Sequence, residues 1–192
     1  MVSAFEIGLL NVWILMLYLP LHPLLMTLID KLVGTGDISK KMGAVPYNEA
    51  EKRTAYASMS VHGLLLIYSV FLPLKLGTAW FHIGLPIYLL GLTMLIITTA
   101  NIATTLLGEP WTEGLYHYSR HPMVLSEFLI SIGVSTASAS WIFLFLSIVY
   151  TVLESSVAVS EERWCLEKYG DAYREYMDRT PRWIGILKSG EK

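Results

Sequence analysis

The sequence has few charged residues and almost no cysteine. Lys, Arg, Asp and Glu make up 16% of its 192 residues, against about 25% in ordinary soluble domains, whereas 54% are hydrophobic. Because so few charges cannot cover a soluble globule, much of the apolar surface must face lipid. The single cysteine, Cys165, excludes an internal disulfide and a multi-thiolate metal site. The net charge of -2 lacks the basic surplus of nucleic-acid-binding proteins, so we expect no nucleic-acid partner.

Long apolar runs predict an all-α integral membrane protein with about five transmembrane helices. The first run lacks a basic leader and a small-residue cleavage site, so we expect a retained span. The last two runs are separated only by Ala-Ser-Ala-Ser, which indicates a helical hairpin. We expect a single membrane domain over 1–192, with three spans in 1–104 and a loop, the hairpin and a C-terminal tail in 105–192. The five expected spans are 5–28, 57–76, 79–104, 123–139 and 141–159.

Basic residues predict the orientation in the membrane, because Lys and Arg concentrate on the cytoplasmic side. With five spans, the loops 29–56 and 105–122 share one side with the tail from about 160. These segments hold every Lys and Arg of the sequence except Lys75. The sequence therefore predicts an N-terminus outside, with both loops and the tail in the cytoplasm.

Three polar residues in the cytoplasmic halves of the expected spans look out of place, namely Glu127, Glu154 and Asn101. An ionisable side chain at membrane depth costs about 2.5 kcal/mol or more and indicates a functional site by default. The alternatives are snorkelling, or a neutral acid bonded to a neighbouring helix. Glu154 and Glu161 are seven residues apart, so a continuous helix places them on one face. Glu161 and Glu162 also fit the solvated end of such a helix.

A second polar group precedes the fourth span. Glu113, His117 and His121 have the four-residue spacing of metal ligands on a helix, but Pro122 disfavours helical backbone at the residue before it. We therefore expect no metal site. Pro122 is better placed as the first residue of the fourth helix. Arg120 and His121 then lie at its N-terminus, where free amides favour an anion such as a carboxylate.

The C-terminal tail contains a helix break followed by a short amphipathic pattern. Gly170 ends one helix, Asp171 can cap the next, and Tyr173 and Tyr176 then share a face. This pattern predicts an amphipathic helix on the membrane surface. Cys165 has no activating base nearby in the sequence, so we expect a structural role for it.

Two motifs and the hairpin between them resemble a known family. A glycine-bearing loop ends in Arg120-His121-Pro122-Met123, and the later motif comprises Glu161-Glu162, Leu166, Tyr169-Gly170, Tyr173, Tyr176 and a terminal Arg. Over roughly residues 105–183 they resemble the integral-membrane methyltransferases typified by isoprenylcysteine carboxyl methyltransferase and the phospholipid N-methyltransferases.

This resemblance implies a methyltransferase that uses S-adenosylmethionine and a lipid or lipophilic acceptor. Arg120 and His121 would hold the methionine part of the donor, and Glu161 or Glu162 would contact its adenosine or the polar groups on the acceptor side. Tyr173 and Tyr176 would close over the pocket. The remaining implied cofactor-binding residues are Thr112, Glu113, Gly114, Leu115 and Tyr116, which wrap the donor, with Pro122 and Met123 of the motif. The expected catalytic residues are Glu154, Glu161 and Arg120.

Two other functions remain open. Membrane sterol and steroid reductases share a similar hairpin and an Arg-His-Pro-like motif but use NADPH, although the short chain and the Pro-Met sequence favour the methyl donor. A non-catalytic carrier or assembly subunit would use Glu127 and Glu154 as interhelical contacts. The sequence leaves open the acceptor, which could be a prenylcysteine carboxylate, a phospholipid amine, a thiol or another lipid. It also leaves open the oligomeric state and the roles of His22, His62 and His82.

Overall fold

The structure, a computed structural model, describes residues 8–36, 38–43 and 45–185. Among these residues the regular elements are helices, and one isolated β-bridge joins Asn11 to Pro73. In chain order the helices are α1 (Trp13–Met16), α2 (Tyr18–Val33), α3 (Ile38–Met42), α4 (Glu49–Val70), α5 (Ala79–Thr104), the 3-10 helix η1 (Gly114–His117), α6 (Pro122–Ser138), α7 (Trp141–Tyr169) and α8 (Asp171–Arg179).

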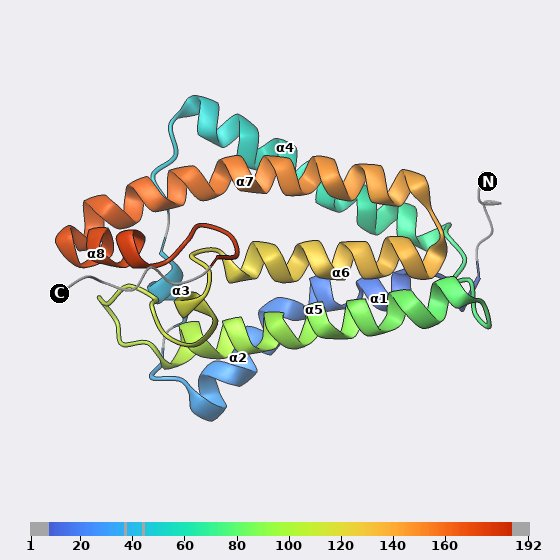
Figure 1. Ribbon diagram of the computed structural model, residues 1–192, viewed down its shortest axis with the longest axis horizontal. Coiled ribbons are helices and arrows are strands. Elements are labelled where there is room, and N and C mark those ends of the chain that lie inside the picture. Colours follow the sequence, from blue (N-terminus) through green and yellow to red (C-terminus); the bar gives the residue numbers. More distant parts are fainter. Residues whose placement is uncertain (1–7, 37, 44, 186–192) are drawn as a thin grey trace.

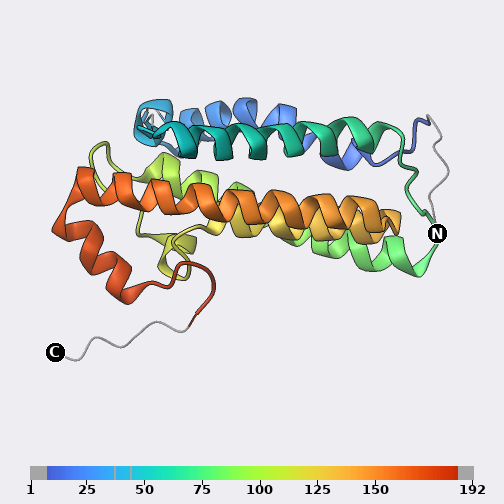
Figure 2. The same cartoon turned by 90° about the horizontal axis from the view of Figure 1, so that it is seen from above.

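The long helices run side by side in two layers. In Figures 1 and 2, α5, α6 and α7 form one layer, and α1, α2 and α4 form the other. The layers are joined where α2 packs on α5 and α4 packs on α7. Helix α8 folds back beside the end of α7 (Figure 2). This arrangement leaves the loops before α4 and α6 at the same end of the molecule as α8.

Glycines allow α5 and α6 to pack closely. A Cβ atom on Gly84 would lie 2.3 Å from the backbone nitrogen of Ala137, and one on Gly133 would lie 2.4 Å from that of Tyr88. Side chains at these positions would push the helices apart. Small residues at such contacts are typical of helix pairs in membranes, where close backbone packing supplies much of the stability.

The structure corrects the bounds predicted for the second span. Helix α4 begins at Glu49 and not at 57, because Asn48 and Glu51 form a capping box that starts the helix in polar sequence. It ends at Val70 and not at 76. The next residues bond to the N-terminal segment, where the amide of Val12 donates to the carbonyl of Leu72, and Pro73 cannot continue a helix.

The other predicted spans agree better with the structure. The first, 5–28, corresponds to α1 and α2, which end at Val33, and its residues 5–7 lie outside the described part. The third, 79–104, coincides with α5, and the hairpin predicted over 123–139 and 141–159 is formed by α6 and α7. Helix α7 continues ten residues beyond 159, to Tyr169. The serine at 140 caps it by accepting from the amide of Phe143.

The helices confirm an all-α protein with apolar membrane-spanning segments. Three stretches in the described part are long and apolar enough to cross a membrane: Trp13–Val33, Ala79–Thr104 and Trp141–Tyr169. The shorter α6 is also apolar, whereas α4 is not among these segments. The number of five spans stays a prediction.

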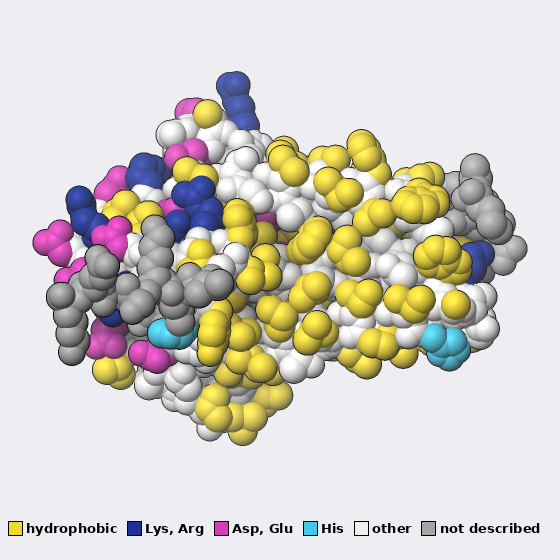
Figure 3. All heavy atoms as spheres, in the orientation of Figure 1, with side chains coloured by type: hydrophobic (Ala, Val, Ile, Leu, Met, Phe, Trp, Pro, Cys, Tyr) yellow, Lys and Arg dark blue, Asp and Glu magenta, His cyan; other side chains and the backbone are white. Residues whose placement is uncertain are grey.

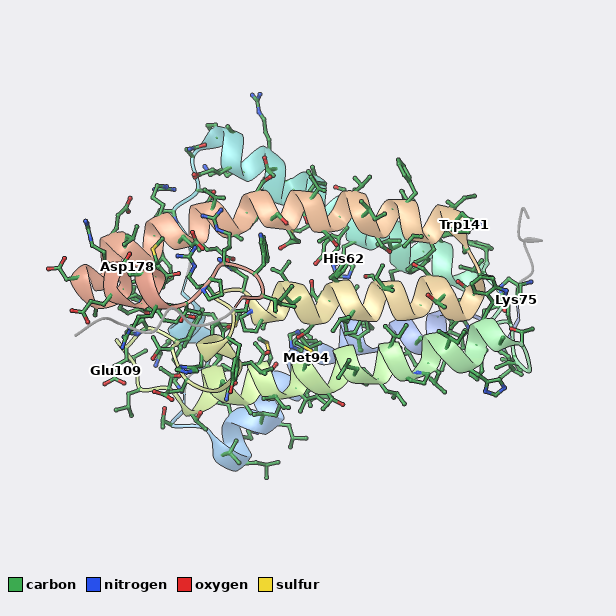
Figure 4. All side chains as sticks on the ribbon, in the orientation of Figure 1. His62, Lys75, Met94, Glu109, Trp141 and Asp178 are labelled. Carbon is green, nitrogen blue, oxygen red and sulfur yellow. The ribbon has the colours of Figure 1, made fainter. Side chains whose placement is uncertain are left out.

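Charged residues are concentrated at one end of the molecule. Figure 3 shows Lys, Arg, Asp and Glu gathered at the end that carries α8, whereas hydrophobic side chains cover most of the remaining visible face. Figure 4 labels Lys75 and Trp141 at the end opposite Glu109 and Asp178. The segregation expected from the sequence is therefore present in the described residues, and Lys188 and Lys192 lie outside them.

Two expectations for the tail are wrong. Gly170, with φ of 57°, is the N-cap of α8, and Asp171 is its first helical residue, without a side-chain cap. The apolar face of α8 is buried in the protein and does not face lipid, since Tyr173 and Tyr176 are 5% and 3% exposed. Both tyrosines belong to a hydrophobic cluster with Ile102 of α5 and Tyr116, which gives that face a better partner than the membrane surface.

Candidate active site

The loop before α6 is shaped by Gly114 and Asn101. Gly114 has φ of 63°, and a Cβ atom there would lie 2.3 Å from the side chain of Asn101. The Asn101 Oδ1 atom accepts a hydrogen bond from the amide of Leu115 at 3.0 Å. Asn101, one of the polar residues noted within the spans, therefore anchors η1 to the end of α5.

The residues just before α6 are bound to the C-terminal segment. The amide of Arg120 donates to the carbonyl of Pro181 at 3.0 Å, and Oγ of Ser119 donates to the carbonyl of Arg182 at 3.0 Å. Pro122 is the first residue of α6, as predicted, and His121 precedes it in non-helical backbone. These contacts hold the side chains of Arg120 and His121 at the start of α6.

A buried carboxylate, Glu162 of α7, brings three basic side chains together. Its Oε1 atom lies 3.1 Å from Nε2 of His121 and 3.1 Å from Nε of Arg120. Arg182 donates from Nε to Oε1 at 3.0 Å and from Nη2 to Oε2 at 2.6 Å, and these hydrogen bonds raise the pKa of Arg182. Arg120, His121 and Arg182 thus surround the negative charge of Glu162. These contacts fix the side chains of Arg120 and His121 in place.

Arg120 keeps hydrogen-bonding capacity despite this contact. Its Nε atom is buried and makes no aligned hydrogen bond within the described residues, although Glu162 is close. The side chain is 10% exposed and lines a cavity. A guanidinium placed in this way is suited to a planar anion such as a carboxylate.

Tyrosines from η1 and α8 close one side of this region. The hydroxyl of Tyr176 donates to the carbonyl of Tyr116 at 2.7 Å, and the rings of Tyr173 and Tyr176 lie 5.5 Å apart. Burial raises the pKa of Tyr116, Tyr173 and Tyr176. All three therefore stay neutral and present aromatic faces and hydroxyl groups.

One cavity of about 480 Å³ collects most of these side chains, and this volume is within the range of small-molecule sites. It extends along α7 from Tyr150 to Tyr169, a rise of about 28 Å. Eight residues expected from the sequence line it: Tyr116, Arg120, His121, Met123, Glu154, Glu161, Tyr173 and Tyr176. Glu154 and Glu161 thus share a face of α7, as their spacing predicts.

Six expected site residues do not line the cavity. Glu162 is not part of the lining, but it contacts Arg120 and His121, which are. The remaining five lie in the segment before α6, in η1 or at the start of α6: Thr112, Glu113, Gly114, Leu115 and Pro122.

Sequence reasoning missed one wall of the cavity. Met42, Gly43, Val45 and Tyr47, from the polar loop before α4, line it, and burial raises the pKa of Tyr47 to about 12. The buried Lys41 holds this loop by bonding to the carbonyl of Ala103 at the end of α5. The sequence offered one signal for this wall, namely isolated aromatic and apolar residues within an otherwise polar loop.

Glu127, one of the polar residues noted within the expected spans, also lines the cavity. Further lining residues from α6, α7 and the loop before η1 were not singled out as site residues: Pro110, Trp111, Val124, Tyr150, Trp164, Cys165 and Tyr169, with Ile102 of α5. Tyr150, Glu154, Glu161 and Cys165 repeat at helical spacing, a pattern that could have extended the predicted face of α7 in both directions.

Comparison with known proteins identifies the family. The family model for phospholipid methyltransferases matches residues 72–172, more than half of the chain. Protein-S-isoprenylcysteine O-methyltransferase of Schizosaccharomyces pombe is 27% identical over 77 residues, which are 40% of this chain and 33% of that protein. The match thus covers about a third of that relative's length. The chain belongs to the phospholipid methyltransferase family, which confirms the resemblance in the motifs.

Proposed function

We propose that this member of the phospholipid methyltransferase family transfers a methyl group from S-adenosylmethionine to a lipophilic or lipid acceptor. The observation that carries the proposal is the single cavity into which the start of α6, one face of α7 and the tyrosines of α8 all project. The family match supports methyl transfer, and the site supplies the groups that such a donor requires.

The lining residues fit S-adenosylmethionine, whose sulfonium makes its methyl group electrophilic. Arg120 binds the carboxylate of the donor through a charge-assisted pair. Glu161, whose Oε2 atom lies 3.6 Å from Nδ1 of His121, complements positive charge on the donor. The aromatic side chains beside them exclude water, which aids a displacement between aligned groups. Glu162 acts on the donor only through Arg120 and His121, which it positions.

The acceptor enters from the membrane in this proposal. Beside Arg120 the cavity is lined by the apolar side chains of Met123, Val124 and Ile102. Within one membrane domain, residues 105–192 supply most of the cavity lining, and residues 1–104 supply the rest, including Tyr47 and Ile102. The concentration of basic residues at the donor-binding end supports a cytoplasmic donor site.

An NADPH-dependent reductase is the competing function. NADPH carries several phosphate groups, whereas the described cavity lining holds one Arg, no Lys, and the carboxyl groups of Glu127, Glu154 and Glu161. This charge distribution favours the methyl donor.

Ligand binding to the purified protein tests the proposal. S-adenosylmethionine at about 100 times its Kd should stabilise the folded protein by about 2.7 kcal/mol, seen as a higher unfolding temperature in detergent, and calorimetry should give a saturable isotherm. NADPH should produce neither effect. If NADPH stabilised the protein and S-adenosylmethionine did not, the proposed methyltransferase function would be wrong and a reductase would be indicated.

A further inference from the structure

The inner end of the cavity holds polar groups that the donor-binding motifs do not include. Glu127 of α6 and Tyr150 and Glu154 of α7 line this end, and Ser58 and His62 of α4 contact them. Figure 4 labels His62 near the middle of the helices' length. Glu154 precedes Glu161 by seven residues, so it lies about 10 Å further along α7 from the donor-binding end.

The two carboxyl groups at this end have different hydrogen-bond donors. Oε2 of Glu127 accepts from the hydroxyl of Tyr150, whose ring lies 4.3 Å from that of His62. Oε1 of Glu154 accepts from Oγ of the fully buried Ser58 at 2.5 Å. Glu154 lies on the same face of α7 as Glu161, which places its carboxyl group in line with the donor-binding end of the cavity. Within the described residues its Oε2 atom has no hydrogen-bond partner.

The charges along the cavity restrict the acceptor. Glu127, Glu154 and Glu161 line it, and Arg120 is the single Lys or Arg among the described lining residues. Arg120 is assigned to the donor's carboxylate and already lies beside Glu162. A carboxylate on the acceptor would place another negative charge beside these acids, and no remaining Lys or Arg of the described lining would neutralise it. Repulsion between like charges is strong where water screens them poorly, so such an acceptor is disfavoured.

We propose, on the basis of the proposed function, that the acceptor is a proton-bearing nucleophile on an apolar body, an amine, thiol or alcohol, and that Glu154 removes its proton. The nucleophilic atom gives an electron pair to the methyl carbon, and the pair of the breaking carbon-sulfur bond stays on sulfur. The proton released from the nucleophile passes to Oε2 of Glu154. Glu127, held by Tyr150, shapes the neighbouring wall. A carboxylate acceptor would need no proton acceptor at this position.

A matched set of amphiphiles tests the acceptor class. Dodecylamine, dodecanethiol, dodecanol and dodecanoate carry the same chain with different head groups, and mass spectrometry identifies each methylated product. We expect transfer to at least one of the first three, and which one reacts identifies the head group. Methylation of dodecanoate should be at least about tenfold slower. Equal or faster ester formation, or donor binding without transfer to any of the three, would overturn the inference.

Variants test the role of Glu154. Glu154→Gln should lower kcat by about 100-fold or more, the usual contribution of a general base, with the donor's Kd within about twofold of the unchanged protein. Glu154→Asp should recover part of the rate. The matched control is Glu175→Gln on the exposed face of α8, which should keep full turnover. Full turnover in Glu154→Gln, or a larger loss in Glu127→Gln, would remove the assignment.

A binding measurement tests the inference without measuring turnover and without adding the donor. Trp111 and Trp164 line the cavity, so their fluorescence reports dodecanoate binding without S-adenosylmethionine. Removing one negative charge in Glu154→Gln should tighten dodecanoate binding several-fold, and Glu175→Gln should not. An unchanged dodecanoate affinity in Glu154→Gln contradicts the inference, whereas failure of donor binding alone contradicts the proposed function.

Discussion

Nε2 of His121 lies 3.1 Å from Oε1 of Glu162, and both side chains are buried. This contact joins the residue before α6 to the cytoplasm-facing part of α7 in the proposed orientation. Arg120 and Arg182 meet the same carboxylate. Glu162 is therefore the common anchor of the loop before α6 and the C-terminal segment, and its loss affects both at once.

Glu162→Gln should destabilise the protein by about 3 kcal/mol, because it keeps the shape of the side chain but leaves Arg120 and Arg182 without their negative partner. Thermal unfolding in detergent, followed by circular dichroism, measures the change. The matched control is Glu167→Gln, which breaks only an exposed pair with Arg163 and should shift stability by less than about 1 kcal/mol. Equal effects of the two variants would show that Glu162 is no anchor.

Arg120→Ala and His121→Ala should each weaken S-adenosylmethionine binding without unfolding the protein. For Arg120 the loss should be about 10- to 100-fold, the range of a hydrogen bond to a charged group. Calorimetry gives the affinity, and circular dichroism verifies the fold. Arg174→Ala is the control, since Arg174 is 73% exposed on α8 and should bind the donor normally. Unchanged affinity in Arg120→Ala would remove its proposed role.

Gly114→Ala should cost more stability than Gly108→Ala. Both glycines have positive φ, so each alanine adds about 1 to 2 kcal/mol of backbone strain. A Cβ atom on Gly114 would also meet the Asn101 side chain at 2.3 Å, whereas one on Gly108 meets nothing within 4 Å. The difference between the two unfolding temperatures isolates the contact with Asn101. Identical temperatures would mean that the loop moves away at no cost.

Cysteine labelling should reveal which end of the protein is cytoplasmic. In a Cys165→Ala background, a membrane-impermeant maleimide should label Lys75→Cys in intact cells and label Glu175→Cys only after permeabilisation. The reason is that Lys75 lies opposite the end where the other basic residues gather. The opposite labelling pattern would reverse the proposed orientation.

Local signals in the sequence were sufficient for much of the fold and part of the site. The apolar runs located α5, α6 and α7, Pro122 marked the start of α6, and Gly170 marked the end of α7. The seven-residue spacing placed Glu154 and Glu161 on one face. Each of these features depends on residues that are close in the chain, where helical geometry is the main constraint.

Such local signals could not predict contacts between segments that are distant in the chain. The loop before α4 looked like a polar connection, yet Lys41 ties it to the end of α5, and Tyr47 lines the cavity. The pattern of α8 suggested contact with lipid, whereas its tyrosines pack on Tyr116 and Ile102. An amphipathic pattern shows that a face is apolar, but the same face fits a membrane or a protein core.

The sequence by itself determined that this is a helical membrane protein with its charges at one end, because apolar length and basic residues follow the chain locally. It also determined the family, through motifs on either side of a hairpin. Only the tertiary structure decided that Glu162 faces three basic side chains while its neighbour Glu161 lines the cavity. Adjacent residues on a helix point about 100° apart, so packing against α6 and the C-terminal segment separates their roles.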